Sequence, residues 1–426
     1  MGWMPRQIRG RPWACGAALA ACWLLPGVAQ AEDAPHLPYD FSATADVRLI
    51  GVDGERSWLD GGFGKLRFGP GNGDDVRIRP QAVEGTLAWT PHLTWSLGAT
   101  IVAIAQRSQD KPIDLSEAYL TFKPMPVGKV KFSARAGLLY PPVSLEHSGP
   151  EWGVRDTITP SAINSWIGEE VKTTGIEITA ATEVRGNRLS LTAGLFGLND
   201  TAGTLLAFRG WALHDEKATV FSRQPLPPLD GFLGMIQAPF TRPVISLDNR
   251  LGFYAKLTWA PPGPFELQAF HYDNRAEPKA VDSELQWGWR TRFDHLGAIL
   301  DIDSRTRLTG QAITGRTRMG HKMDGATWID TRFRSAFLLL THQVGSGSVS
   351  ARIEAFGTHS HGSVADAEYG ENGWAITAAA RRPITPFATM VIELIHVESR
   401  REQREDVELS PMQDQTLGQL ALKLKI

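Results

Sequence analysis

The sequence predicts an all-β fold: a transmembrane antiparallel β-barrel of sixteen strands, or alternatively eighteen, with long loops that fold inward. Three observations support this prediction. Many segments of 8 to 12 residues alternate between apolar and polar side chains, as a tilted strand that crosses a bilayer requires. Tight turns alternate with much longer connections. After residue 31 no apolar stretch of 18 residues follows, so the sequence offers no ordinary transmembrane helix.

The beginning of the chain has the order of a secretory signal peptide. A basic segment precedes an apolar run at 14–28, and Ala29-Gln30-Ala31 fits an A-x-A cleavage site. We therefore expect a signal peptide over residues 1–31 and an outer-membrane β-barrel over 32–426. A lipoprotein cleavage box that ends at Cys22 is the alternative.

Composition limits the class of protein further. Glycine accounts for 42 of 426 residues, about 10% against a usual 7%, and there are 14 tryptophans. Both cysteines, Cys15 and Cys22, lie in the predicted signal, which leaves the exported chain without a disulfide framework or a cysteine metal site. Three of the 44 basic residues lie there too, so 41 remain against 46 acidic residues. This balance argues against nucleic acid as a partner.

The segment 129–138 shows the alternation most clearly. Its even-numbered side chains are apolar, and its odd-numbered ones are polar or glycine. A shift of one residue would turn three cations toward lipid, at about 2 to 4 kcal/mol each near the bilayer midplane. We therefore predict that the even-numbered side chains face lipid. The side chains expected on the lumen face are Lys129, Lys131, Ser133 and Arg135.

The strand number follows from the turns. Seven short connections rich in Gly, Pro, Asn or Ser predict hairpins, and they lie at 90–92, 124–128, 185–187, 261–264, 303–306, 345–347 and 383–386. Seven hairpins supply fourteen strands. An opening strand at 40–50 and a closing strand at 417–426 make sixteen, an even number. A further hairpin formed by 58–68 and 76–83 would make eighteen.

Four short motifs between residues 70 and 180 occur in a characteristic order. They are DVRIR at 75–79, VEGTL at 83–87, LSEAYL at 115–120 and AGLLYPPVSLE at 136–146. In order and spacing they resemble the phosphate- and polyphosphate-selective porin family of Gram-negative outer membranes. The resemblance implies a sixteen-stranded homotrimer in the bacterial outer membrane, with a lumen narrowed by inward-folded loops. It also implies passive diffusion of small hydrophilic solutes, including anions such as phosphate, and outer-membrane lipid as a partner.

The strands alone predict no strong field in the lumen, because inward cations and acids nearly balance. One local feature stands out: Lys129, Lys131 and Arg135 share a strand face, with side chains at i and i+2 about 6.6 Å apart. They form either part of an anion path or a basic group at the periplasmic mouth. The residues that we expect to line the pore are Lys129, Lys131, Arg135, Arg188, Lys256, Arg352, Arg209, Arg223 and Arg242.

Two long connections, 140–174 and 199–250, are the candidates for the constriction. The second is too apolar to extend into water, so we expect it to fold into the barrel or over a neighbouring subunit. Folding inward would carry Arg209, Arg223 and Arg242 into the channel. Alternatively these arginines cap loop carbonyls or pair with Asp215 and Asp230.

The sequence carries no common hydrolase, metalloprotease or phosphate-loop motif, so we predict neither an enzyme nor a cofactor. His359-Ser360-His361 has strand-like spacing but lacks a neighbouring carboxylate set, and we predict no metal site. The alternative function is an outer-membrane barrel hydrolase that acts on lipid or peptide. Such an enzyme would need a serine, a histidine and an acid brought together at the outer rim. Ion conductance would separate the two functions.

Overall fold

The computed structural model describes residues 41–70, 77–107, 109–229, 231–323, 325–364 and 370–426. The predicted signal peptide, residues 1–31, lies outside the described residues. Within the described ranges, none of the helices has both the length and the apolar character needed to cross a membrane.

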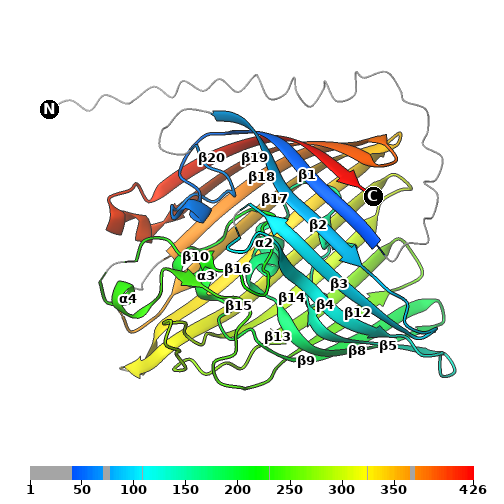
Figure 1. Ribbon diagram of the computed structural model, residues 1–426, viewed down its shortest axis with the longest axis horizontal. Helices are drawn as coiled ribbons and strands as arrows, with labels where there is room; N and C mark the ends of the chain where they lie inside the picture. Colours follow the sequence, from blue (N-terminus) through cyan, green and yellow to red (C-terminus); the bar gives the residue numbers. More distant parts are fainter. Residues whose placement is uncertain (1–40, 71–76, 108, 230, 324, 365–369) are drawn as a thin grey trace.

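The described residues form one closed barrel of sixteen antiparallel strands (Figure 1). Each strand pairs with the next one along the chain, and the last pairs with the first. The prediction of sixteen strands is therefore confirmed. The strands are β1 (Phe41–Val52), β2 (Arg77–Trp89), β3 (Leu97–Gln106), β4 (Asp114–Phe122), β5 (Val130–Leu139), β8 (Thr173–Val184), β9 (Asn187–Gly197), β12 (Gly252–Ala260), β13 (Phe265–Asp273), β14 (Arg290–Asp301), β15 (Thr306–Met323), β16 (Ala326–Val344), β17 (Gly347–Ser360), β18 (Gly370–Thr385), β19 (Ala388–Arg401) and β20 (Met412–Lys425).

All seven predicted hairpin turns join neighbouring barrel strands at one end of the barrel. The alternative of eighteen strands is wrong. Residues 58–68 form no barrel strand; they contain the 3-10 turn η1 (Trp58–Asp60) and then run buried inside the barrel. The physical reason is charge: Lys65 and Arg67 find carboxylate partners inside, Glu371 and Asp215, that a lipid-exposed strand would not provide.

The strands alternate because their two faces meet different surroundings. On β16, Ala336, Leu338 and Leu340 are exposed on the outer wall, whereas Phe337 and Leu339 are buried on the inner wall. On β5, Phe132 is exposed on the outer face and Arg135 pairs on the inner face, as predicted. Leu138, predicted to face lipid, is instead almost completely covered.

The segment 140–172 folds into the barrel, as expected. It contains the short strands β6 (His147–Ser148) and β7 (Gly153–Val154) and the helix α2 (Ala162–Glu170). All nine residues of α2 are buried.

The second long segment, 198–251, divides in two. Its first part, with α3 (Thr204–Phe208), is buried through residue 219. The remainder is partly exposed and contains β10 (Gln224–Pro225), α4 (Gly231–Ile236) and β11 (Phe240–Thr241). A last short element, η3 (Glu402–Val407), lies between β19 and β20.

Aromatic side chains bind the inward segments to the wall. The ring of Trp166 on α2 lies 5.4 Å from Phe293 and 5.2 Å from Phe333, measured between ring centroids. Trp211 of the second segment lies 6.1 Å from both Trp166 and Phe333. Such tilted and edge-on pairs stabilise by about 0.5 to 1.5 kcal/mol each beyond the burial of area. The middle of the barrel is therefore a packed core rather than open water.

The register of β5 predicts opposite chemical access for adjacent positions. Cysteine in Lys131→Cys should react with a water-soluble maleimide, because position 131 lies on the inner face. Cysteine in Phe132→Cys should react with a lipid-phase reagent, as should Ile178→Cys, an outward control on the neighbouring strand. Labelling in vesicles, read by mass spectrometry, measures both. Equal labelling of positions 131 and 132 by both reagents would contradict the register.

Candidate pore and its inward-folded segments

The three basic residues predicted as a line on β5 occupy different surroundings. Lys129 lies in the turn before the strand, and both Lys129 and Lys131 are exposed. Arg135 is half-buried and donates to Glu177 on β8 through Nε at 2.8 Å and Nη2 at 2.9 Å. Its charge is therefore neutralised, and two free cations remain near the mouth.

Two further predicted residues also lie on inner strand faces. Arg188 is exposed at the start of β9, directly opposite Glu183 on β8. Lys256 is half-buried on β12, on the same face as Tyr254. Neither makes an ion pair with another described residue.

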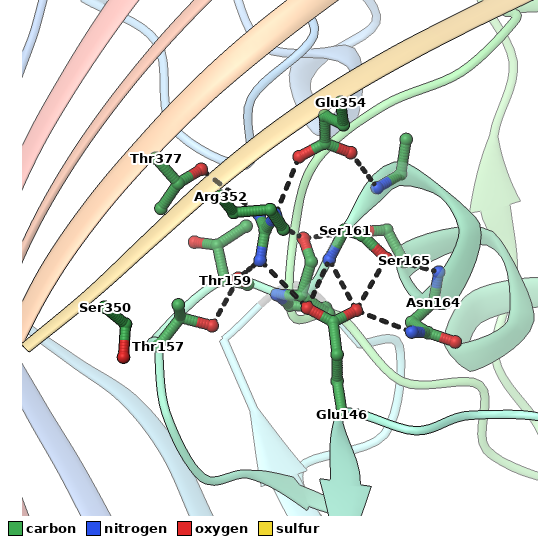
Figure 2. A network of polar contacts seen from close by, with 12 residues as sticks. Glu146, Thr157, Thr159, Ser161, Asn164, Ser165, Ser350, Arg352, Glu354 and Thr377 are labelled. Carbon is green, nitrogen blue, oxygen red and sulfur yellow. Dashed lines mark hydrogen bonds and ion pairs between the residues drawn. The ribbon is translucent and has the colours of Figure 1, made fainter. Parts of the chain in front are cut away.

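Arg352 on β17 is fully buried, although we predicted it as a pore-lining residue. Its guanidinium donates to Glu354 at 2.8 Å and to Glu146 at 3.0 Å. It also donates to the carbonyl oxygens of Thr159 and Pro160, at 2.9 and 3.0 Å (Figure 2). Arg352 therefore fastens the segment 140–172 to the wall and presents no charge to open water.

Glu146 links two parts of the segment 140–172 to each other. Its carboxylate accepts from the Ser161 backbone at 2.9 Å and from the Ser161 hydroxyl and Asn164 amide at 2.5 Å each (Figure 2). The Ser161 side chain in turn caps α2 by accepting from the Asn164 backbone. One buried carboxylate thus joins β17 to the start of α2.

Two wall carboxylates satisfy backbone donors at the same place. Glu354 accepts from the Ala162 backbone at 2.7 Å, and Glu393 on β19 accepts from Ile158 at 2.6 Å and Thr159 at 3.0 Å. A helix N-terminus leaves such donors unpaired and favours negative charge. The wall therefore provides the partners that this end of α2 requires.

Arg209 is buried as well, in contact with α2. It forms an ion pair with Glu169, and its guanidinium lies 4.4 Å from the ring centroid of Trp58. His214 approaches the same carboxylate at 2.9 Å. Arg209 therefore joins the two inward segments to each other.

Arg223 and Arg242 lie at the partly exposed end of the second segment. Both approach Glu284, Arg242 at 3.0 Å and Arg223 at 3.4 Å, and Arg223 also stacks over Phe240. The acids named as partners in the sequence analysis, Asp215 and Asp230, differ from Glu284. Asp215 pairs with Arg48 and Arg67 inside the barrel, and Asp230 lies outside the described residues.

A hollow of about 390 Å³ lies between the 147–155 segment and the inner wall, at the short-turn end. Its four acids all have basic partners. Glu84 pairs with Lys217 at 2.7 Å, and Glu151 pairs with Lys425. Asp46 and Asp215 share Arg48, and Asp215 also pairs with Arg67. Lys423 and Arg381 also line the hollow, and neither forms an ion pair with a described carboxylate. The hollow therefore contains two basic side chains, Lys423 and Arg381, beyond those that form ion pairs with its acids.

Most residues of this hollow were absent from the predicted site. Arg381 sits next to a predicted turn, and its inward direction follows from the alternation of β18. Lys217 lies in an irregular segment, where no period indicates a direction. Only the fold brings it to Glu84, 133 positions away.

Two histidine sites bear on the alternative function. Ser144 Oγ lies 2.9 Å from His147 Nδ1, but the His147 ring stacks on Trp152, and no described carboxylate hydrogen-bonds to it. His359 and His361 face outward with ring centroids 4.2 Å apart. The described residues contain no group of three side chains suited to a metal ion.

No protein-family model and no curated protein matches the sequence. The outer membrane channel DcaP of Acinetobacter baumannii superposes with a TM-score of 0.52 at 12% identity, covering 91% of this chain and 96% of DcaP. A loop L8 deletion mutant of OmpT, an outer membrane protein of Vibrio cholerae, gives 0.49 at 8% identity, with 91% and 98% covered. A mutant Rh. blastica porin gives 0.39 at 11%, with 91% and 100% covered.

The likeness to DcaP shows that the chain has the fold of an outer-membrane channel. This fold agrees with the porin-like barrel that the resemblance of the sequence motifs implies.

Arg352→Met should release the segment 140–172, because it leaves Glu146 and Glu354 buried without their cation. Breaking a buried pair costs about 3 to 5 kcal/mol, which corresponds to a rise of more than about a hundredfold in the open population. Trypsin should then cleave after Lys172, which is fully buried in the folded protein. Arg307→Met, which removes a more exposed pair with Asp301, is the matched control. Unchanged cleavage in a folded Arg352→Met barrel would refute the anchoring role.

Proposed function

We propose that this protein is an outer-membrane porin, a passive diffusion channel for small hydrophilic solutes with a weak preference for anions. The observation that carries the proposal is the closed sixteen-strand barrel whose hollow holds two cations, Lys423 and Arg381, without ion-pair partners among the described residues. Charges that line a pore set its selectivity. Phosphate is one anion of suitable chemistry, in accord with the motif resemblance.

The proposed path runs past the inward segments rather than through the centre. The core around Trp166 and Trp211 occupies the middle, so solutes must pass between the segments and the wall. Of the nine predicted pore residues, the inner-face residues with some exposure suit this path: Lys129, Lys131, Arg188 and Lys256. Arg352 and Arg209 instead act as anchors of the segments that narrow it.

A homotrimer in the bacterial outer membrane, with lipid and solutes as the other partners, completes the proposal. The trimer is implied by the motif resemblance, and the molar mass of the detergent-solubilised protein, measured by light scattering, tests it. Conductance in a planar bilayer tests the channel itself. Discrete ion-conducting steps support the porin, and a sealed barrel with hydrolytic activity supports the alternative enzyme.

Charge reversal in the hollow should change ion selectivity. Under a KCl gradient, the wild-type reversal potential should indicate a preference for chloride. The double variant Lys423→Glu, Arg381→Glu should move it toward potassium, because two free cations become two anions in the hollow. Arg185→Glu, an exposed turn residue away from the hollow, is the control. If the double variant conducts with the wild-type reversal potential, these residues do not line the path.

A further inference from the structure

Basic side chains gather on the outer wall of the barrel, at the end with the long connections. On β16, Arg332 and Arg334 are exposed and share the outward face with Ala336 and Leu338. On β14, Arg292 shares the outward face with Leu296 in the same way. The outer basic cluster, as we name it, consists of Arg292, Arg316, Arg332, Arg334, His359 and Arg400.

Four members of the outer basic cluster form one row across neighbouring strands. Arg292 is opposite Arg316, Arg316 is opposite Arg332, and Arg332 is opposite His359. Opposed side chains start about 4.5 to 5.5 Å apart, and like charges so placed destabilise a sheet. A row of this kind requires negative charge from somewhere.

The chain supplies part of that charge. Asp330 receives two hydrogen bonds from Arg316, and Glu402 pairs with Arg400 at 3.0 Å. Arg292, Arg332 and Arg334 form no ion pair with any carboxylate in the described ranges. The guanidinium groups of Arg332 and Arg334 are therefore available to an anion from outside, whereas Arg292 lies directly opposite Asp273 on β13.

A hollow of about 510 Å³ is lined by Arg332 and Arg334, whereas Arg292 lies two strands away on β14. Gly357 and Gly370 leave room at its floor, while Arg334, Arg400 and Glu402 stand among its walls. Guanidinium groups bind phosphate through two parallel hydrogen bonds. The hollow thus offers a charged recess for a phosphate group.

The cluster lies at the height of the lipid headgroups. Arg316 is ten residues along β15 from its start at Thr306, at the short-turn end. At about 3.4 Å per residue and a tilt of about 35 to 45°, this is a rise of about 25 Å. The apolar band of an outer-membrane barrel is also about 25 Å tall. The row of arginines therefore meets the boundary between acyl chains and headgroups.

An apolar groove of about 820 Å³ lies on the same outer wall. Leu296, Leu338 and Ile353 line it, and Ala336 belongs to its small-residue floor. Ala336 is two residues from Arg334 on β16, so the groove continues directly below the basic cluster. A recess for phosphate above a groove for a hydrocarbon chain matches the two ends of one lipid molecule.

We propose that the outer wall over β14 to β17 binds a phosphate-bearing membrane lipid, with its phosphate on the outer basic cluster and an acyl chain in the apolar groove. The occupant is a lipid rather than free phosphate, because the recess is continuous with an apolar groove that suits a hydrocarbon chain and offers free phosphate no contact. The site is on the outer wall, so it does not depend on the proposed channel function.

Native mass spectrometry of the whole barrel in detergent tests the site with bisphosphorylated lipid A as the probe. Wild type should bind it at least about tenfold more tightly than fully dephosphorylated lipid A, which corresponds to one lost charge-assisted contact. The triple variant Arg292→Gln, Arg332→Gln, Arg334→Gln should lose the same factor. The matched control Arg185→Gln, Arg275→Gln, Arg305→Gln removes three exposed charges elsewhere and should bind as wild type. Ala336→Trp, which fills the groove, should also weaken binding.

Two results would overturn the proposal. In the first, wild type binds both lipids equally, an outcome that does not depend on whether any variant folds. In the second, inorganic phosphate in large excess displaces the lipid completely, which would make the cluster a simple anion site. Retention of lipid against free phosphate, with loss in both the arginine and groove variants, supports a lipid site.

Discussion

The buried charge of Arg352 connects the wall of this barrel to its contents. An arginine on a membrane-spanning strand cannot remain unpaired at low dielectric, since an isolated buried charge is very costly. Glu146, Glu354 and two backbone carbonyls satisfy it, and two of the four belong to the turn before α2. The strand therefore requires the segment 140–172 inside the barrel, and the segment requires the strand. Neither is complete alone.

The same dependence extends to the other inward segments. Glu169 on α2 forms an ion pair with Arg209 of the segment 198–251. Asp215 of the segment 198–251 forms an ion pair with Arg67, which lies in the connection between β1 and β2. Each pair crosses from one connection to another, so the three connections order one another. Because the charged side chains of these connections pair with one another, the aromatic side chains between the connections can pack as a core. The inward segments thereby fill the middle of a wide barrel.

Arginines inside the barrel and arginines on its outer wall differ in whether the chain supplies them with carboxylate partners. Those buried inside, such as Arg48 and Arg352, have carboxylate partners from the chain, because water cannot solvate them there. Arg332 and Arg334 on the outer wall lie where water and lipid headgroups are within reach. The chain can therefore leave their charges without carboxylate partners, as the proposed lipid site requires.

The sequence by itself determined the parts of this protein that depend on local period. Strict alternation predicted the strands, and seven turns predicted sixteen of them while leaving eighteen open. The cations of 129–138 predicted which face of β5 points inward. The sequence predicted Arg352 and Arg209 as pore-lining residues, whereas the structure buries both. It also made the two long connections the candidates for the constriction. Only the tertiary structure decided what these residues meet. Arg352 and Glu146 are 206 positions apart, and Glu146 lies in an irregular connection with no period to show its direction. The alternation of apolar and polar side chains indicates only which face of a single strand points inward. Ion pairs between connections form only when the barrel closes and brings the connections together.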